Sequence, residues 1–396
     1  MTLRPKLLII PHLFTNQIKV RSFEFAKRLT PYFNVYFWRL EDLSLIDHPS
    51  FLRRRIEQLK LTCGSFLQRI RIDAPDSEVA YVHASFLSPS LLSKVFGFRR
   101  GTQLSRIYNT LSLQRVLCQL RPDIVWLASM SFYVPRVSTP FFFDFVDWFP
   151  EDCSQRMEDV KDYIKHLKAR VKAAFAPSDL LAAKITNEYG IPVIPLHNGA
   201  DVKTLRQVDP QQVQSVRRRW GLEGKFVIGY IGNHGSFAGI DFLIKVFREL
   251  RKGMPDSCLF IVGPIDYWRS FLLSAQVEGI IATGPIEPEQ VSAYFNAIDL
   301  GVIAFERNPG TNFIFPLKLV EYTACRKFVV STPLPQIAHL HWPNILLAER
   351  NVEEWVRAIF KARTLHWESA WDSLAEPYDW HQLAAQLASH FMRTLV

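Results

Sequence analysis

The sequence predicts an α/β protein with two doubly wound domains, each built on a mostly parallel sheet. The chain has 396 residues, more than one ordinary hydrophobic core accommodates. Hydrophobic residues make up 48% of it and charged residues 21%, a composition typical of folded proteins. Short β-rich runs alternate with helical patterns through both halves, and this alternation favours open parallel sheets.

The predicted strands are short apolar runs bounded by turn residues. They cover residues 6–10, 34–38, 78–82, 123–127, 140–145, 192–196, 226–231, 258–262, 279–282, 299–303 and 328–331. Helices are predicted between them, for example over 17–29 and 157–172. Apolar residues recur with the period of a helix after Gly239, which predicts a helix packed against a sheet. These residues are Leu243, Val246, Phe247 and Leu250.

The boundary between the domains is predicted at residues 197–201, a turn-rich stretch that follows a strand. The first domain then covers 1–200 and the second 201–376. Residues 377–396 hold a last helix outside the strand–helix series, and we expect it to pack back on the first domain.

Cysteine usage and the absence of targeting segments predict a cytoplasmic protein. The five cysteines are odd in number and far apart, which favours neither a disulfide framework nor a zinc site. The apolar run before Pro11 is too short for a signal peptide, and no stretch has the apolar length that spans a bilayer.

A glycine-rich turn follows the strand at 226–231. Gly232, Gly235 and Gly239 lead into the helix, and glycines let a backbone approach a phosphate while a helix N-terminus offers N–H groups to it. The spacing is not that of a dinucleotide fingerprint, and an ordinary tight turn has the same composition.

A second pattern lies at residues 315–335. Pro316 suits the start of a helix, which places Lys318 and Glu321 on one face as i, i+3 neighbours. The ammonium could hold a diphosphate, and the carboxylate could accept hydrogen bonds from both hydroxyls of a ribose. The alternative is an exposed Lys–Glu pair on a surface helix.

These patterns resemble the C-terminal domain of family-4-type GT-B glycosyltransferases, especially the bacterial polysaccharide branch with teichuronic-acid-type enzymes. The resemblance covers about residues 226–335 and rests on the stretches IGYIG…GIDFLIKVF, LFIVGP, IIATGPIEPEQVSAYFNAIDLGVIAF and PLKLVEYTACRKFVVSTPLP, in family order and spacing. The first half matches more loosely, through FFFDFVDWF, APSDLLAAKI and IPLHNGAD.

The resemblance implies a GT-B architecture, with two Rossmann-like domains facing across a cleft. It implies that the first domain binds the acceptor and the second the nucleotide-sugar donor. Glu321 corresponds to the glutamate that grips the donor ribose, and Lys318 to a basic residue near the diphosphate. The loop with Gly232, Asn233 and Gly235 faces the phosphates.

The resemblance also places Thr311 and Asn312, in the segment 308–313, against the donor sugar. Neither a metal nor another cofactor is expected, because backbone dipoles and cations stabilise the leaving diphosphate in this class.

Three positions depart from the family pattern. A glutamate usually stands eight residues before the ribose glutamate, where this chain has Phe313. Two diphosphate-binding cations are also missing, since Asn233 and Ala238 replace the usual Arg and Lys. Either Lys318, Arg307 or a base of the first domain replaces them, or the site is weak. The resemblance implies retention of the anomeric configuration, but the missing glutamate at position 313 leaves inversion open.

Two aspartates in the first half are candidate catalytic residues. Asp144 and Asp147 are three apart in a predicted strand, so they point to opposite faces. We expect one to be structural and Asp147, at the strand's carboxyl end, to be a general base for an inverting transfer. A helix cap or a turn residue is the alternative for Asp147.

The loop after the first strand, residues 11–21, lines the acceptor side in the family. His12, Asn16 and Arg21 are therefore expected to contact the acceptor, although a lone loop histidine is more often only solvated.

The net charge of +9 lies in the first half, and residues 51–121 carry 12 basic and 4 acidic residues. Apolar residues between these cations predict peripheral contact with an anionic membrane. The alternative is a basic helix that solvates a domain edge. Nucleic acid binding is not expected, because no known reader module accompanies the charge.

The predicted function is transfer of a sugar from a UDP- or GDP-sugar to a glycan or lipid-linked acceptor at the cytoplasmic membrane face. Two other functions fit the same fold: a sugar-nucleotide epimerase, and a catalytically silent partner subunit.

Overall fold

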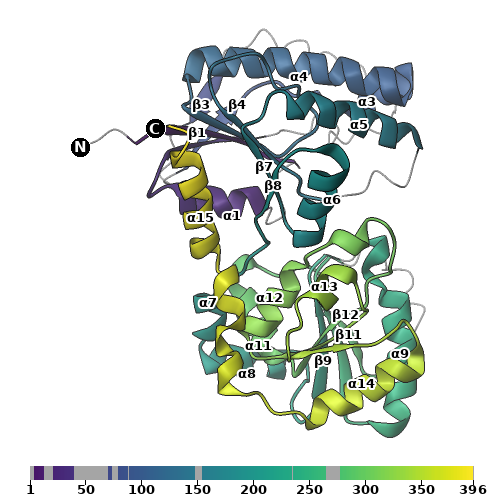
Figure 1. Cartoon of the computed structure of the whole chain (residues 1–396). Coiled ribbons are helices and arrows are strands. Elements are labelled where there is room, and N and C mark those ends of the chain that lie inside the picture. Colours follow the sequence, from purple (N-terminus) through teal and green to yellow (C-terminus); the bar gives the residue numbers. More distant parts are fainter. Residues whose placement is uncertain are drawn as a thin grey trace, which may run out of the picture. The chain divides into compact units, whose positions relative to one another are not determined.

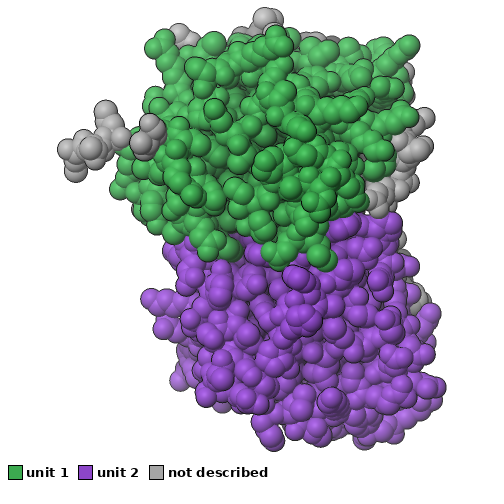
Figure 2. Space-filling view, in the orientation of Figure 1, with its two compact units in different colours: residues 1–196, 383–396 green, residues 197–382 purple. Residues whose placement is uncertain are grey.

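The computed structural model describes residues 4–12, 21–39, 70–73, 79–87, 89–147, 154–233, 235–264 and 277–395. It divides the chain into two compact units (Figure 2). Unit 1 comprises residues 1–196 and 383–396, and unit 2 comprises residues 197–382.

Unit 1 is built on a sheet that has eight strands within the described residues, in the order β3-β4-β2-β1-β5-β6-β7-β8. Figure 1 labels β1, β3, β4, β7 and β8 of this sheet. The strands are β1 (Lys6–Ile10), β2 (Asn34–Trp38), β3 (Arg71–Asp73), β4 (Val79–His83), β5 (Ile124–Leu127), β6 (Phe141–Asp144), β7 (Ala173–Ala176) and β8 (Val193–Pro195). Neighbours run parallel except β3 and β4, which are antiparallel.

The central strands of this sheet are buried along their length. β1 pairs with β5 from Leu7 opposite Ile124 to Ile10 opposite Leu127, and all four residues of β5 are buried. Continuous apolar runs are what a parallel sheet covered on both faces requires. The predictions for β1 and β2 are confirmed residue by residue. β3 and β7 were not predicted, and the helix predicted over 157–172 ends at Lys168.

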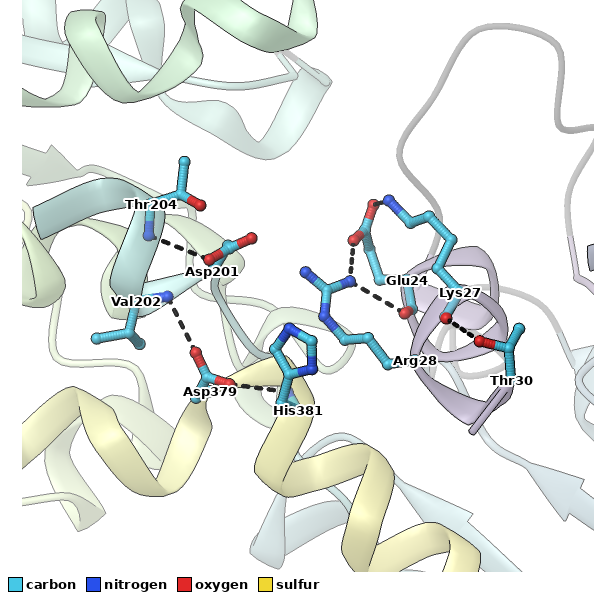
Figure 3. A network of polar contacts seen from close by, with 9 residues as sticks. All are labelled: Glu24, Lys27, Arg28, Thr30, Asp201, Val202, Thr204, Asp379 and His381. Carbon is cyan, nitrogen blue, oxygen red and sulfur yellow. Dashed lines mark hydrogen bonds and ion pairs between the residues drawn. The ribbon is translucent and has the colours of Figure 1, made fainter. Parts of the chain in front are cut away.

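The described helices of unit 1 connect these strands. They are α1 (Arg21–Leu29), α3 (Pro89–Phe96), α4 (Phe98–Leu120), α5 (Ser154–Lys168) and α6 (Asp179–Tyr189). On α1, Glu24 accepts hydrogen bonds from Lys27 at 2.8 Å and Arg28 at 2.7 Å (Figure 3). The last helix, α15 (Trp380–Met392), belongs to this unit from Leu383 on, and its Phe391 packs against Phe142 with ring centroids 4.7 Å apart.

Unit 2 is built on a parallel sheet that has six strands within the described residues, in the order β11-β10-β9-β12-β13-β14. The strands are β9 (Phe226–Ile231), β10 (Ser257–Val262), β11 (Ile280–Ala282), β12 (Leu300–Ile303), β13 (Phe328–Ser331) and β14 (Ile345–Leu347). The described α-helices are α7 (Val202–Arg206), α8 (Pro210–Arg219), α9 (Ile240–Gly253), α11 (Val291–Ala297), α12 (Leu317–Ala324), α13 (Pro335–His339) and α14 (Val352–Thr364). The predictions for β9, β13 and the buried stripe of α9 are confirmed.

One tyrosine fixes α12 on the sheet of unit 2. The hydroxyl of Tyr322 accepts a hydrogen bond from the Ile231 N–H and donates one to the Gly229 carbonyl, each at 3.0 Å. The Tyr322 ring lies so close to Gly301 that a Cβ there would come within 2.5 Å of it. The helix is therefore held in register against the carboxyl end of β9.

The unit boundaries fall a few residues from the predicted positions 200/201 and 376/377. Ala200 pairs with Asp379 in an isolated β-bridge, and the Asp379 carboxylate accepts hydrogen bonds from the N–H groups of Val202 at 3.2 Å and His381 at 2.8 Å (Figure 3). These contacts hold residues 377–382 in unit 2, so the last segment does not join unit 1 until Leu383.

Candidate functional site

A buried ion pair lies where β6 ends in unit 1. Arg21, the first residue of α1, donates from Nε to Asp144 Oδ2 at 2.9 Å, and its Nη2 lies 3.4 Å from Oδ1. The side chains are only 3% and 0% exposed. Burial raises the pKa of Asp144, and the charge and hydrogen bond of Arg21 oppose this rise.

His12, two residues past the end of β1, lies within electrostatic range of the same guanidinium. Burial and the charge of Arg21 lower the pKa of His12 to about 4, so its imidazole is neutral at pH 7. Its buried Nδ1 has no hydrogen-bond partner among the residues that the structure describes. The ring could accept or donate one hydrogen bond to a polar ligand.

Asp147 lies three residues past Asp144; the residue is accessible to solvent, but protein surrounds its carboxyl group. Desolvation by the protein around it raises the pKa of Asp147 to about 7, with Arg21 opposing the rise and Asp144 adding to it. A carboxyl group that titrates near pH 7 is suited to proton transfer. The structure thus brings four predicted site residues together: the charge of Arg21 acts on the side chains of His12, Asp144 and Asp147.

One prediction for unit 1 needs correction. β6 ends at Asp144, so Asp147 is in the coil beyond the strand and the argument from opposite strand faces does not apply. Arg21 and Asp144 are buried against each other in an ion pair, and the acceptor contact of Arg21 and the catalytic role of Asp144 stay predictions. Asn16 lies outside the described residues.

The glycine-rich turn of unit 2 follows β9 and precedes α9. Gly232 has φ of 125° and Gly239 has φ of 72°, both in the region that favours glycine. A Cβ on Gly239 would lie 2.1 Å from the Ala304 carbonyl oxygen, so α9 starts tightly against the end of β12. Asn233 is exposed, and its carbonyl accepts a hydrogen bond from the Tyr230 hydroxyl at 2.9 Å.

Lys318, in the first turn of α12, lies against this turn. Its side chain reaches Gly232, where a Cβ would lie 3.4 Å from Cε and 3.5 Å from Nζ. The residue is 7% exposed, and its Nζ has no hydrogen-bond partner among the described residues. Burial lowers the pKa of Lys318 to about 7, and the charge of Glu321 opposes this shift. The predicted alternative, an exposed Lys–Glu pair, is wrong for Lys318.

The ammonium of Lys318 is enclosed by two aromatic rings. Its Nζ lies 3.5 Å from the centroid of the Tyr230 ring and 5.2 Å from that of Phe305. Sequence reasoning did not identify either ring as part of the site. The only available signal was position, since Tyr230 belongs to β9 and Phe305 follows β12 where parallel strands end at the same edge.

The loop before α12 is shaped by its own hydrogen bonds. Asn308 Oδ1 accepts from the N–H groups of Gly310 and Thr311, both at 2.9 Å, and Thr311 Oγ1 donates to the Glu306 carbonyl at 2.6 Å. Thr311 is fully buried and its hydroxyl shapes the loop, while its contact with the donor sugar stays a prediction. Asn312 is only partly buried, and its Oδ1 has no described hydrogen-bond partner.

Two of the basic residues predicted to face a membrane, Arg106 and Arg99, form ion pairs with acidic residues of α5. Arg106 is buried and makes two 2.7 Å hydrogen bonds to Asp159, while Arg99 Nη2 lies 3.3 Å from Asp162. Residues 51–69 lie outside the described residues. Among the described helices, none is both long and apolar enough to cross a membrane.

Two comparisons show what this chain is similar to. Residues 225–363, within unit 2, match the model of the family described as Glycosyl transferases group 1. The whole chain has the fold of GT-B glycosyltransferases.

One relative and three solved structures illustrate this similarity. The putative teichuronic acid biosynthesis glycosyltransferase TuaH of Bacillus subtilis (strain 168) is 35% identical over 127 residues, which cover 32% of this chain and only 31% of that protein. The E. coli trehalose-6-phosphate structure bound with UDP-2-fluoro glucose has a TM-score of 0.71 at 10% identity, covering 98% of both chains. The structure of a glycosyltransferase from Rickettsia africae ESF-5 has a TM-score of 0.68 at 14% sequence identity, covering 100% of this chain and 99% of that chain. The structure of Anabaena Alr3699/HepE in complex with UDP-glucose has a TM-score of 0.61 at 14% sequence identity, covering 99% of both chains.

Proposed function

We propose that the protein transfers a sugar from a nucleoside diphosphate sugar to a glycan or lipid-linked acceptor. The observation that carries this proposal is the buried Lys318 ammonium against Gly232, with Glu321 one helical turn later, inside the segment that matches the glycosyl transferase family. UDP in several solved structures of the same fold favours a UDP- or GDP-sugar as donor.

In this proposal unit 2 holds the donor. Glu321 accepts hydrogen bonds from the ribose hydroxyls, the backbone at Gly232 faces the diphosphate, and Lys318 neutralises the charge that develops on it. The N-terminus of α9 adds a favourable dipole. These groups stabilise the leaving diphosphate without a metal ion, as oriented dipoles and cations do in a preorganised site.

Unit 1 provides the acceptor side. An acceptor hydroxyl oxygen attacks the anomeric carbon, the bond from that carbon to the diphosphate breaks, and the hydroxyl proton passes to Asp147. The group is suited to this because its pKa of about 7 leaves much of it ionised at neutral pH. A retaining transfer, in which the leaving phosphate takes the proton, would not need Asp147.

A binding screen tests the donor part of the proposal. UDP-, GDP-, ADP- and CMP-sugars are compared by thermal shift, since a ligand at 100 times its Kd adds about 2.7 kcal/mol of stability. We expect stabilisation by UDP- or GDP-sugars and little by CMP-sugars, which lack the diphosphate. The absence of binding by any nucleoside diphosphate sugar would favour a silent partner subunit. Altered free sugar nucleotide formed without an acceptor would favour an epimerase.

We also propose that unit 1 contacts an anionic membrane on its cytoplasmic face, through α4. Three apolar side chains on one stripe of this helix are exposed: Leu104 by 44%, Ile107 by 51% and Leu111 by 46%. The helix contains four arginines and no acidic residue; Arg99 and Arg100 are exposed, whereas Arg106 is buried against Asp159. An exposed apolar stripe beside cations is typical of an interfacial helix.

Vesicle sedimentation tests the membrane contact. We expect binding to phosphatidylglycerol vesicles that weakens as salt rises, and a clear loss when Leu104, Ile107 and Leu111 are all replaced by Gln. Val137→Gln, at an exposed apolar residue elsewhere in unit 1, is the matched control. Equal binding to neutral and anionic vesicles would contradict the electrostatic part.

A further inference from the structure

The buried amine of Lys318 is in an unusual position for a lysine. Its residue is 7% exposed, and none of the three hydrogens of an ammonium finds a described acceptor. The rings of Tyr230 and Phe305 offer cation–π contacts at 3.5 and 5.2 Å, which offset only part of the lost hydration. The free protein therefore disfavours the charged form of this side chain.

Among the residues that the structure describes, one charged group acts on the Lys318 amine. Glu321, one turn along α12, is the charged group that acts on the amine. The hydroxyl of Tyr230 on β9 stays protonated, since burial raises its pKa well above the usual value. Tyr322 on α12 also remains neutral, because burial raises its pKa. Phe305 and Gly232 carry no ionisable side chain. Burial lowers the pKa of Lys318 to about 7, although the charge of Glu321 opposes this shift.

The open side of the amine is the glycine turn. A Cβ on Gly232 would lie 3.4 Å from Lys318 Cε and 3.5 Å from Lys318 Nζ. Because glycine has no Cβ, this space beside the amine is open. The sequence has no Lys or Arg between Gly232 and Gly239. A diphosphate bound along this turn would thus meet Lys318 as its cation on this side.

We propose that above pH 7 most Lys318 side chains are uncharged in the free protein and become ammonium groups when a nucleoside diphosphate binds beside Gly232, so that donor binding takes up a proton. The inference rests on the proposed function and extends it. The amine nitrogen gains one proton from solvent, and the new N–H groups donate to diphosphate oxygens. No covalent bond of the nucleotide changes in this step.

Isothermal titration calorimetry with UDP in buffers of different ionisation enthalpy measures this proton directly. A pKa of about 7 predicts uptake of about 0.8 proton at pH 7.5 and nearly 1 at pH 8.5. The Kd should rise about eightfold between these two pH values, because a growing share of the amine must first be protonated. UDP itself is almost fully ionised above pH 7.5, since the second pKa of a phosphate group is about 6.

Three variants separate Lys318 from other groups. Lys318→Met should bind UDP roughly 10- to 100-fold more weakly, with neither proton uptake nor pH dependence. Lys318→Arg keeps a permanent charge and should bind without uptake. Lys245→Met, at an exposed lysine of α9, is the matched control and should behave as the wild type.

Each outcome of the titration is decisive. UDP binding to the wild type without proton uptake overturns the inference and leaves the proposed function intact, as does uptake that persists in Lys318→Met. Failure of UDP and GDP alike to bind the wild type refutes the proposed function, and the inference with it.

Discussion

Removing the guanidinium of Arg21 tests the organisation of the unit 1 site. Arg21→Met keeps the length of the side chain and leaves the Asp144 carboxylate buried without its partner. Both side chains are at most 3% exposed, so water cannot replace the 2.9 Å hydrogen bond. Breaking a buried ion pair on one side costs about 3–5 kcal/mol. We expect unit 1 to lose that much stability at pH 7.

The loss should depend on pH. Burial already raises the pKa of Asp144, and without Arg21 the pKa rises further. The folded variant then binds more protons than the unfolded chain above pH 4, so its stability falls as pH rises through this range. At pH 5 the variant should therefore be closer to the wild type than at pH 7. Replacing both partners, Arg21→Met with Asp144→Leu, should recover most of the loss.

Hydrogen exchange of unit 1 peptides under increasing urea is the suitable assay, because two units need not unfold in one transition. Arg71→Met is the control, since the exposed Arg71–Asp73 pair should contribute at most about 1 kcal/mol. A cost for Arg21→Met no larger than that of the control would refute the reasoning. So would a double variant that is no more stable than the single one.

Three further changes probe the proposed chemistry and the fold of unit 2. Glu321→Ala should weaken nucleoside diphosphate binding by about 1.5–3 kcal/mol in calorimetry, and unchanged affinity would remove the ribose role. Asp147→Asn should lower turnover by about 10²–10⁴-fold with donor affinity kept. In the wild type, turnover should rise with pH through about 7, as the base loses its proton, and a flat profile would exclude this base. Gly239→Ala should destabilise unit 2 by more than about 1 kcal/mol in urea denaturation, because its Cβ meets the Ala304 carbonyl; a neutral effect would contradict the tight packing there.

The apolar pattern predicted most of the strands, including the three-residue β8 and β11, and missed β3, β7 and β14. β9 and β13 are continuous apolar runs between turn residues, so their pattern is unambiguous. β7 has the sequence Ala-Ala-Phe-Ala, in which alanine also favours helix, and the adjoining helix was extended toward it. β14 has three residues, too few to show a period.

Spacing along the chain predicted part of the site, and contacts between distant segments determined the rest. The i, i+3 spacing of Lys318 and Glu321 follows from helix geometry. The burial of Lys318 depends on Tyr230, which is far from it in sequence. The pairing of Arg21 with Asp144 joins residues 123 positions apart, so spacing carries no trace of it. Both contacts change what the side chains can do chemically.

Acceptor-dependent release of the nucleoside diphosphate tests the central claim most directly. The nucleotide sugar that binds best is incubated with the protein and with lipid-linked glycans, and both the diphosphate and the labelled sugar are followed. The account predicts that sugar appears on the acceptor in equal amount to the diphosphate released, and that Glu321→Ala reduces both together. A bound donor that releases no diphosphate with any acceptor, or that is converted to another sugar nucleotide without one, would contradict the account.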